Sequence, residues 1–376
     1  MSTSAKTWLE RIHALPIQRK LRIMNVCGGH ERSITLAGLR GALPKQVELI
    51  PGPGCPVCVC PEEDVYQAIQ LALHEDIILV AFGDMLRVPV NVPKAEARSL
   101  EQAKASGADI RPIASPSEAV RIAREHPERD VVFFAAGFET TTAPVAAMLA
   151  EGVPHNLSLL LSGRLTWPAV AMLLNSDTPG FDCLIAPGHV STIMGPEEWE
   201  FVVRDHGIPA AVAGFTPESL LAAMYSVLRQ QLEQRPFLDN CYPEIVRAGG
   251  NPAARRVLGE TLQVIDANWR GVGTIPASGY GLAKDYAHLD IRARFPDYTN
   301  NARKRAGEMP PGCDCAKVVL GRIYPNECRL YGRACTPRKP IGPCMVSDEG
   351  ACRIWWSSGI RESAAPAEDG ATPAPA

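Results

Sequence analysis

Cysteine is the residue type that stands out in this chain, because a thiolate can hold a soft metal or act as a nucleophile. Six of the twelve cysteines gather near the C-terminus: Cys313, Cys315, Cys328, Cys335, Cys344 and Cys352. Three more form a sparse N-terminal set, with Cys27 ahead of a Gly-Gly-His segment and Cys55 and Cys58 in a Cys-x-x-Cys arrangement. The chain therefore combines the pattern of a fixed metal site with a pattern suited to thiol chemistry.

The spacing of the C-terminal set favours an iron–sulfur cluster over a zinc ribbon. A ribbon presents two close pairs of cysteines, and here only Cys313 and Cys315 are close. The other intervals are wide, irregular and interrupted by prolines, which suits the separated corners of a [4Fe–4S] cluster. Zinc binding, and cysteines that only fill a core, are the alternatives. The spacing alone does not choose four ligands among the six.

The N-terminal set has the surroundings of reactive thiols. Cys27 follows an apolar segment, and the two glycines after it let the backbone approach a ligand closely. His30 is a candidate proton acceptor or metal ligand beside it. Cys55 and Cys58 precede a predicted helix that begins near Pro61, and a helix N-terminus lowers the pKa of a nearby thiol. The alternative is that all three are ordinary buried cysteines.

Neighbouring residues qualify this interpretation. Three acidic residues at positions 62–64 partly oppose the effect of the helix on the thiols. Cys60 lies in the same loop and is interpreted as a bystander, and Cys183 and Cys241 are interpreted as packing residues.

Four polar residues, Asp84, Arg87, Glu139 and His189, each follow a predicted strand. This is where α/β proteins place functional side chains, although a structural role such as helix capping is the alternative for each. None of the glycine-containing loops completes a phosphate-binding motif, so no nucleotide site is predicted.

Seven short apolar segments, each ending in a glycine-containing loop, predict buried parallel strands. They span residues 21–26, 47–50, 77–82, 131–136, 157–161, 183–186 and 210–213. Helical patterns lie between them, and in residues 62–74 apolar side chains recur every four positions. This alternation indicates an α/β fold built on parallel sheets.

The chain divides by pattern into three parts and a tail. Similar phrases follow the strands that end near residues 82 and 136, so we expect two related parallel-sheet α/β domains, at residues 1–118 and 119–215. From residue 216 come helices, one starting at 217 and one over 252–264, and then a segment rich in Gly, Pro and Cys. We therefore expect a third, partly helical, Cys-rich iron–sulfur domain at 216–360, and a disordered tail at 361–376.

Composition narrows the classes of partner. The formal net charge of −3 over 376 residues argues against nucleic-acid binding, which needs a basic surface. The basic run at residues 303–305 is interpreted as solvated surface. No apolar run reaches the length of about 18 residues that a membrane span needs, and residues 1–20 lack the apolar core of a signal peptide. We expect a cytoplasmic protein, where cysteines favour metal binding or catalysis over structural disulfides.

Taken in order, the motifs of this sequence resemble those of the HypD family of [NiFe]-hydrogenase maturation factors, over roughly residues 20–357. The segments that carry the resemblance are Cys27-Gly28-Gly29-His30, Gly52-Pro53-Gly54-Cys55-Pro56-Val57-Cys58, Phe82-Gly83-Asp84-Met85, Gly137-Phe138-Glu139-Thr140-Thr141, Pro187-Gly188-His189-Val190, Cys335-Thr336-Pro337 and Gly342-Pro343-Cys344-Met345-Val346-Ser347. One such segment would be weak, but together they are specific. The resemblance implies two related α/β domains and a third that carries a cluster.

The resemblance also implies a cofactor and partners. A [4Fe–4S] cluster would sit in a Cys-x12-Cys-x6-Cys-x16-Cys frame, leaving Cys313 and Cys344 outside; the frame is met by Cys315, Cys328, Cys335 and Cys352. The protein would be a scaffold that works with a small HypC-type chaperone to build a transient Fe(CN)2(CO) unit. A HypE-type partner would deliver the cyanide groups, and the hydrogenase large subunit would receive the product.

Carried over residue by residue, the resemblance makes Cys27 an iron ligand, together with a cysteine of the HypC-type partner. Cys55 and Cys58 would form a dithiol–disulfide pair that links this site to the cluster. His30 and Asp84 would line the site.

Two residues depart from the family pattern. Glu31 stands where a hydroxyl residue is expected, and Cys60 is an added thiol that could offer an alternative disulfide partner. Two other functions stay open: a stand-alone iron–sulfur thiol–disulfide oxidoreductase, active without a chaperone, and a colourless interaction protein stabilised by zinc. We favour a scaffold for metallocentre assembly over a classical turnover enzyme.

Overall fold

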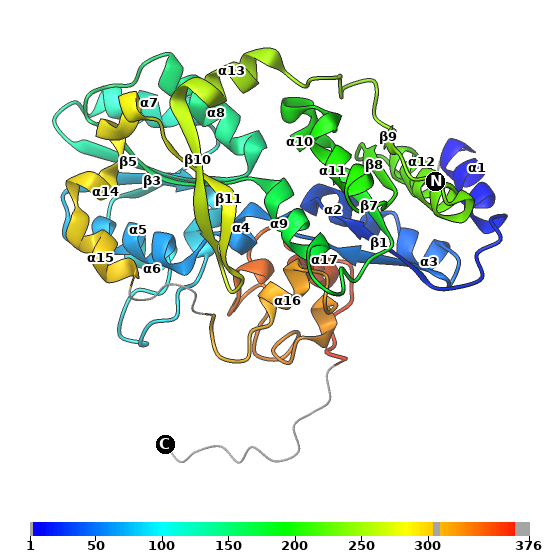
Figure 1. Ribbon diagram of the computed structural model, residues 1–376. Coiled ribbons are helices and arrows are strands. Elements are labelled where there is room, and N and C mark those ends of the chain that lie inside the picture. Colours follow the sequence, from blue (N-terminus) through cyan, green and yellow to red (C-terminus); the bar gives the residue numbers. More distant parts are fainter. Residues whose placement is uncertain (1–2, 304–308, 365–376) are drawn as a thin grey trace, which may run out of the picture.

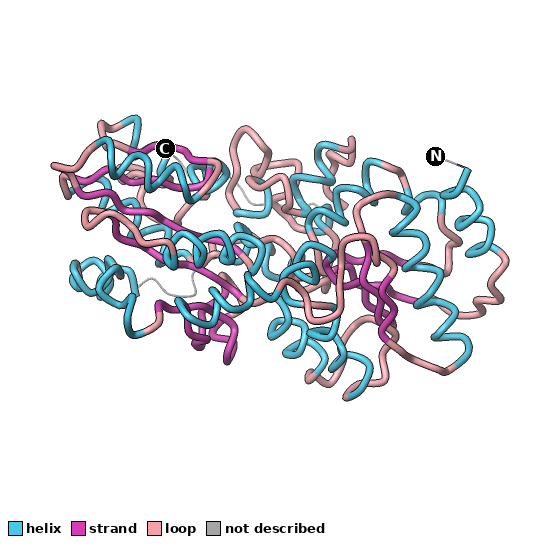
Figure 2. The backbone as a smooth tube through the Cα atoms, turned by 90° about the horizontal axis from the view of Figure 1, so that it is seen from above, coloured by secondary structure: helices cyan, strands magenta, loops and turns pink. Residues whose placement is uncertain are grey.

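The computed structural model describes residues 3–303 and 309–364. Two β-sheets lie side by side with helices on their faces, and the cysteine-rich region, residues 313–357, packs below the junction between them (Figure 1). Seen from above, the two sheets form separate lobes of one molecule (Figure 2). The fold is α/β with two parallel-dominated sheets and a cysteine-rich C-terminal region, as predicted.

The first sheet has five parallel strands in the order β2-β1-β7-β8-β9. Its strands are β1 (Leu21–Asn25), β2 (Val47–Pro51), β7 (Cys183–Pro187), β8 (Ala210–Ala213) and β9 (Leu238–Asn240). The ends of β1 and β2 are in register at Asn25 and Pro51. The loops that carry Cys27 and Cys55 therefore leave the sheet side by side, at the carboxyl edge where α/β proteins bind ligands.

The second sheet has six strands in the order β10-β11-β6-β5-β3-β4. Four are parallel, and a hairpin extends the sheet antiparallel to β6. The strands are β3 (Ile77–Phe82), β4 (Ile110–Ile113), β5 (Asp130–Gly137), β6 (Leu157–Arg164), β10 (Leu262–Trp269) and β11 (Gly273–Leu282).

The hairpin is a difference from the sequence prediction. The helix expected over 252–264 ends at Thr261, and β10 follows at once. Residues 263–266 of β10 are all exposed at the open edge of the sheet, so the strand lacks the alternation of buried and exposed side chains that identifies strands in a sequence.

Each sheet is assembled from distant parts of the chain. Residues 1–118 supply β1 and β2 to the first sheet but β3 and β4 to the second, and residues 119–215 are likewise divided. The domain boundaries at 118 and 215 stay a prediction, whereas the sheets themselves draw strands from both sides of each boundary. Apolar runs reveal strands but not their partners, and for this reason sequence alone did not indicate the crossing.

Four apolar cores lie on the four sheet faces, because successive strand side chains point to opposite sides. The first sheet packs against α1 (Thr3–His13), α2 (Gly28–Leu36), α3 (Leu39–Ala42) and α12 (Pro217–Glu233) on one face, and α9 (Thr166–Leu174), η2 (Pro196–Trp199) and α11 (Glu200–Arg204) on the other. One face of the second sheet packs against α7 (Pro116–Glu125), α8 (Glu139–Ala150) and α13 (Pro252–Thr261).

The other face of the second sheet is the one that reaches the cysteines. Its core continues from β3 and β5 into the loop at residues 52–60, here called the thiol loop, and into the cysteine-rich region. The elements on this side are α4 (Pro56–Val59), α5 (Glu62–His74), α6 (Leu100–Ala105), α14 (Ile291–Arg294), α15 (Pro296–Arg303), α16 (Cys315–Val319) and α17 (Ala351–Ser357). The remaining short helices are α10 (Gly188–Met194), η1 (Gly83–Arg87), η3 (Lys284–Leu289), η4 (Pro325–Glu327) and η5 (Pro343–Met345).

Two predictions concern residues at the limits of the described chain. Positions 304–305 of the basic run, and positions 365–376 of the predicted disordered tail, lie outside the described residues. Residues 361–364 are described and belong to no helix or strand. Within the described ranges, no helix has the length and hydropathy that crossing a membrane requires.

Candidate functional site

Cys27 occupies the N-cap of α2, directly after β1. Two glycines let other segments come unusually close to it. A Cβ atom on Gly54 would lie 2.5 Å from the Cys27 Cα, and one on Gly28 would lie 2.5 Å from the Cβ of Glu349. The Gly28 amide also donates to the Gly54 carbonyl at 3.0 Å. The glycines thus allow the Cys27 turn, the thiol loop and the cysteine-rich region to meet.

The protonation of Cys27 follows from this packing. Burial of the thiol raises its pKa to about 12, although the residue as a whole is partly exposed. The backbone N–H of His30, at the start of α2, lowers the pKa, and the negative charge of Glu349 raises it. In the metal-free protein Cys27 is therefore a neutral thiol at pH 7.

Cys55 and Cys58 form a disulfide. Cys55 is the N-cap of the short helix α4, and its sulfur accepts a hydrogen bond from the Cys58 amide at 3.2 Å. The two residues are only 4% and 2% exposed. The helix that the sequence places after them is α5, whose bounds of 62–74 match the prediction.

A small cavity joins the two N-terminal cysteine sites to the C-terminal set. Cys27, Cys55, Cys344 and Glu349 all line it, and its volume is about 10 Å³. A cavity of this size holds about one water molecule. Cysteines from three separate segments therefore line one small, partly open cavity.

Glu349 is the residue of this site that sequence reasoning missed. The residue as a whole is exposed, but local desolvation of its carboxyl raises the pKa to about 7, and the negative Asp84 contributes further. The pKa of Asp84, in η1, is also raised by desolvation and by Asp348, while a hydrogen bond from Ser347 opposes the rise. The sequence could have indicated Glu349 only by its position, because it comes two residues after the Gly342–Ser347 motif.

His30 is fully buried and neutral. Its Nε2 lies 3.0 Å from the carbonyl oxygen of Ala213, which can only accept, so this nitrogen carries the proton. Burial lowers the pKa of His30 to about 4. The ring packs against Phe215, on which the exposed His189 stacks at 3.9 Å between ring centroids. His30 and His189 thus both contact the ring of Phe215.

The other loop residues singled out by sequence have structural partners. Glu139 is buried and accepts hydrogen bonds from the amide and hydroxyl of Thr166, both at 2.7 Å, at the start of α9. Arg87 donates to the carbonyl of Pro337 at 2.7 Å, which ties η1 to the cysteine-rich region. Helix capping and segment docking account for these two residues.

The six C-terminal cysteines are brought together in part. Among the described residues, the sulfurs of Cys315, Cys344 and Cys352 lie within 4.8 Å of one another, and all three residues are buried. Cys313 Sγ lies 3.3 Å from Cys315 Sγ. Cys328 and Cys335, which the family frame implies as ligands, are buried but do not join this group; Cys335 Sγ accepts from the Ile341 amide at 3.4 Å. Buried thiols this close fit a soft metal centre.

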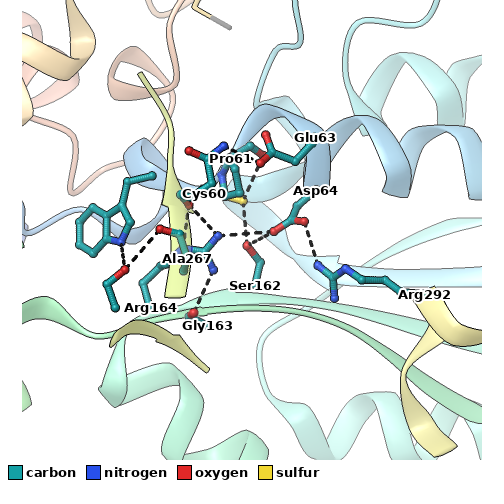
Figure 3. A network of polar contacts seen from close by, with 12 residues as sticks. Cys60, Pro61, Glu63, Asp64, Ser162, Gly163, Arg164, Ala267 and Arg292 are labelled. Carbon is teal, nitrogen blue, oxygen red and sulfur yellow. Dashed lines mark hydrogen bonds and ion pairs between the residues drawn. The ribbon is translucent and has the colours of Figure 1, made fainter. Parts of the chain in front are cut away.

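The three acidic residues at the start of α5 each have a partner other than the thiols. The sequence predicts that their charges oppose the effect of the helix on the thiol pKa values. Glu62 pairs with Arg270, and Glu63 accepts from the Asn268 amide. Asp64 pairs with Arg292, lies 3.7 Å from Arg164, and accepts from Ser162 at 2.6 Å (Figure 3). Two of the three charges are thus balanced by buried arginines.

Cys60 belongs to the same network rather than to the disulfide. Its sulfur lies 3.5 Å from Ser162 Oγ, a contact that is drawn as a dashed line in Figure 3. Burial raises the pKa of its thiol to about 12. A neutral, buried thiol that faces Ser162 is poorly placed to replace either partner of the disulfide.

The fold and the site together define an α/β protein in which a single thiol, a disulfide and a set of metal-competent cysteines share one edge of a sheet. The HypD family model, described as the hydrogenase formation hypA family, matches residues 3–359. The chain is 40% identical over 352 residues to the hydrogenase maturation factor HypD2 of Bradyrhizobium diazoefficiens, covering 91% of this chain and 90% of that protein. It is 38% identical over 352 residues to the hydrogenase maturation factor HypD of Escherichia coli, covering 93% and 92%. The chain therefore belongs to the HypD family.

Alkylation should reveal how Glu349 controls Cys27. Only the thiolate reacts, and Glu349→Gln removes a negative neighbour, so the pKa of Cys27 falls and the metal-free variant is alkylated faster than wild type. The difference should be present above pH 7, where the wild-type carboxylate is ionised, and vanish as the pH falls and that carboxyl becomes protonated. Peptide mass spectrometry measures the alkylation rates of the variant and of wild type at each pH. Glu125→Gln, which is far from Cys27 in the fold, is the control. Equal rates for the variant and wild type above pH 7 would contradict the assignment.

Proposed function

We propose that this protein is the scaffold on which Cys27 and a cysteine of a HypC-type chaperone hold the Fe(CN)2(CO) unit of a [NiFe]-hydrogenase during assembly. The observation that carries this proposal is the small cavity that is lined by Cys27, Cys344, Glu349 and Cys55, the last of which is bonded to Cys58. One thiol for the cargo, a redox-capable pair and metal-competent cysteines converge there. The cyanide groups would come from a HypE-type partner, and the hydrogenase large subunit would receive the product.

The size of the cavity favours a cargo held on the outer side of Cys27. A volume of about 10 Å³ cannot hold an iron ion with three diatomic ligands, whereas Cys27 itself is partly exposed. A second protein can then supply the other thiolate. The amides of Gly29 and His30 donate toward the Cys27 sulfur and would stabilise the thiolate that iron requires.

Metal binding releases the thiol proton, and the site contains acceptors for it. Glu349, with a pKa of about 7, is half-ionised at neutral pH and faces Cys27. Asp84 is the second carboxyl of this group, and its charge already acts on Glu349. His30 would serve as a neutral wall of the site, since its Nε2 proton is held by the Ala213 carbonyl.

The cysteine-rich region fits an iron–sulfur centre by the chemistry of its donors, which are buried soft sulfurs gathered within a few ångström. We propose a [4Fe–4S] cluster held in the family frame by Cys315, Cys328, Cys335 and Cys352. When bound, such a cluster supplies one-electron redox chemistry. Cys55 and Cys58 would alternate between the disulfide and the dithiol, a change of two electrons and two protons provided by an external reductant.

The experiment that tests the function is anaerobic purification of the protein with its chaperone and cyanide-donating partners. Infrared spectra of the complex should contain CN and CO stretching bands that the separate proteins lack, and metal analysis should find iron. Colourless protein that contains zinc, or a complex with iron but no such bands, would reject the proposal. Iron and sulfide contents of six single Cys→Ser variants decide between the family frame and a ligand set that includes Cys344.

The stand-alone thiol–disulfide oxidoreductase is the less favoured function. Such an enzyme must bring its own dithiol into contact with a disulfide of another protein, and Cys55 and Cys58 are nearly fully buried. Reduction of protein disulfides without any chaperone would favour this alternative instead.

A further inference from the structure

Arg270 is a buried cation with unused hydrogen-bonding capacity. The residue is 2% exposed, and its Nη2 donates to Glu62 Oε2 and to the Pro89 carbonyl, both at 2.7 Å. Its Nε and Nη1 are buried, and neither has a hydrogen-bond partner among the described residues. Buried charged donors without partners are costly, so they call for a group that accepts from them.

The position of Arg270 indicates where such a group lies. Its backbone amide donates to the carbonyl of Val59, in the thiol loop, at 3.0 Å. The next residue, Gly271, packs so closely on α16 that a Cβ atom there would lie 3.0 Å from the Cβ of Ala316, the neighbour of Cys315. Arg270 is therefore placed between the thiol loop and the start of the cysteine-rich region.

The charge of Arg270 acts on cysteines of both segments. The pKa of the Cys313 thiol is raised first by its hydrogen bond to Cys315 and then by burial, and Arg270 is the cation that opposes this rise. Arg270 has the same lowering effect on Cys60, whose pKa is raised mainly by burial. Its field thus reaches both the cysteine-rich region and the thiol loop.

We propose that Arg270 is a positioning residue that sets the reduction potential of the metal centre, through a buried positive charge and two buried N–H groups that have no partner among the described residues. This inference rests on the proposed function, because it requires an iron–sulfur centre in the cysteine-rich region. Reduction adds negative charge to such a centre, and a nearby buried cation with N–H donors stabilises that charge. Glu62 offsets part of the effect, since its carboxylate pairs with the same guanidinium.

The test is a redox titration of the reconstituted full-length protein, followed by absorption and electron paramagnetic resonance. Arg270→Gln should lower the midpoint potential, with a change of about tenfold or more in the reduction equilibrium constant, which is about 59 mV for a one-electron couple. Arg270→Lys keeps the charge but not the geometry of the donors. Its midpoint potential should therefore lie between those of Arg270→Gln and wild type.

A matched control is Arg164→Gln. Arg164 is buried too, but its donors are used by the carbonyls of Gly163 and Asn268, and it lies 3.7 Å from Asp64 (Figure 3). Its loss should destabilise the protein and leave the midpoint potential unchanged.

If Arg270→Gln fails to fold, Glu62→Gln provides a second variant, for which the expected shift of the midpoint potential is in the opposite direction. Removal of the carboxylate leaves the guanidinium uncompensated, so the midpoint potential should rise. A bound cluster with the wild-type potential in either variant would overturn this inference and leave the proposed function standing. Wild-type protein that takes up no iron–sulfur cluster would reject both.

Discussion

Replacement of Cys27 by alanine is expected to abolish hydrogenase maturation while the iron–sulfur absorption of the protein stays as in wild type. Cys27 is the one thiol of its set that is neither bonded to another cysteine nor enclosed, because Cys55 and Cys58 form a disulfide and Cys60 is 1% exposed. Under the proposed function, its loss removes the thiol that would bind the cargo together with a partner's thiolate. The C-terminal cysteines are untouched by the change.

The measurement is complementation of a strain that lacks the endogenous maturation factor, with hydrogenase activity and large-subunit processing as readouts. Infrared spectra of the purified complex should have lost the CN and CO bands. Cys241→Ala is the matched control, since Cys241 is also partly exposed and free but packs against the core of the first sheet, next to α12. Normal maturation with Cys27→Ala would remove Cys27 from the cargo site.

A structural effect of the variant can be separated from a chemical one. The Cys27 sulfur is a weak acceptor, so its contacts with the Gly29 and His30 amides contribute little, and alanine at this position should cost little stability. Cys27→Ser, which keeps the size of the side chain, should fail in maturation as alanine does, because a hydroxyl does not bind iron as a soft thiolate does. Restored maturation by serine would indicate a packing role.

The sequence was sufficient for seven of the strands and for the local surroundings of the cysteines, but β4 and β9 were not predicted. All seven predicted strands are present, because parallel strands buried on both faces appear as continuous apolar runs. The turn at Cys27 and the helix at 62–74 depend on near neighbours, so local pattern predicts them. The hairpin β10–β11 lies at an exposed edge and lacks such a pattern.

What sequence could not predict arises from contacts between distant segments. Glu349 approaches Cys27 only because two glycines, Gly28 and Gly54, allow three backbone segments to pack closely. Likewise, Cys344 joins Cys315 and Cys352 through the fold of the cysteine-rich region, although the spacing of the family frame leaves it out. Interval and composition carry no information on such contacts.

The contacts of Glu31 with distant segments could not be predicted from the sequence either. Its replacement is the second change for which we expect a large effect, here on the stability of the protein. In sequence it is a departure from the family pattern, where a hydroxyl residue is expected. In the structure it is 2% exposed and accepts from three segments. Arg40 Nη2 lies 2.7 Å from both of its oxygens, Trp355 Nε1 donates at 2.7 Å, and Asn25 Nδ2 donates at 3.0 Å.

These contacts make Glu31 the tie between the Cys27 turn and the cysteine-rich region. Trp355 belongs to α17, which also carries Cys352, and α17 packs on α2. The Arg40 guanidinium lies over the ring of Trp355 at 5.2 Å, so it too depends on the position of that side chain. Loss of the carboxylate would leave the Arg40 guanidinium and the Trp355 Nε1–H without this acceptor, while Asn25 Nδ2 would keep its bond to the Ile50 carbonyl.

Glu31→Ala is therefore expected to lower the free energy of unfolding by about 3–5 kcal/mol, the cost of breaking a buried ion pair from one side. Urea unfolding measures the loss, and hydrogen exchange should show α17 opening more readily than α12, which packs on the first sheet and not on the cysteine-rich region. The exposed pair Arg121–Glu125 is the control, and Glu125→Ala should cost less than about 1 kcal/mol. If Glu31→Ala were as mild as this control, the coupling of the Cys27 turn to the cysteine-rich region would have to depend on the glycine contacts alone.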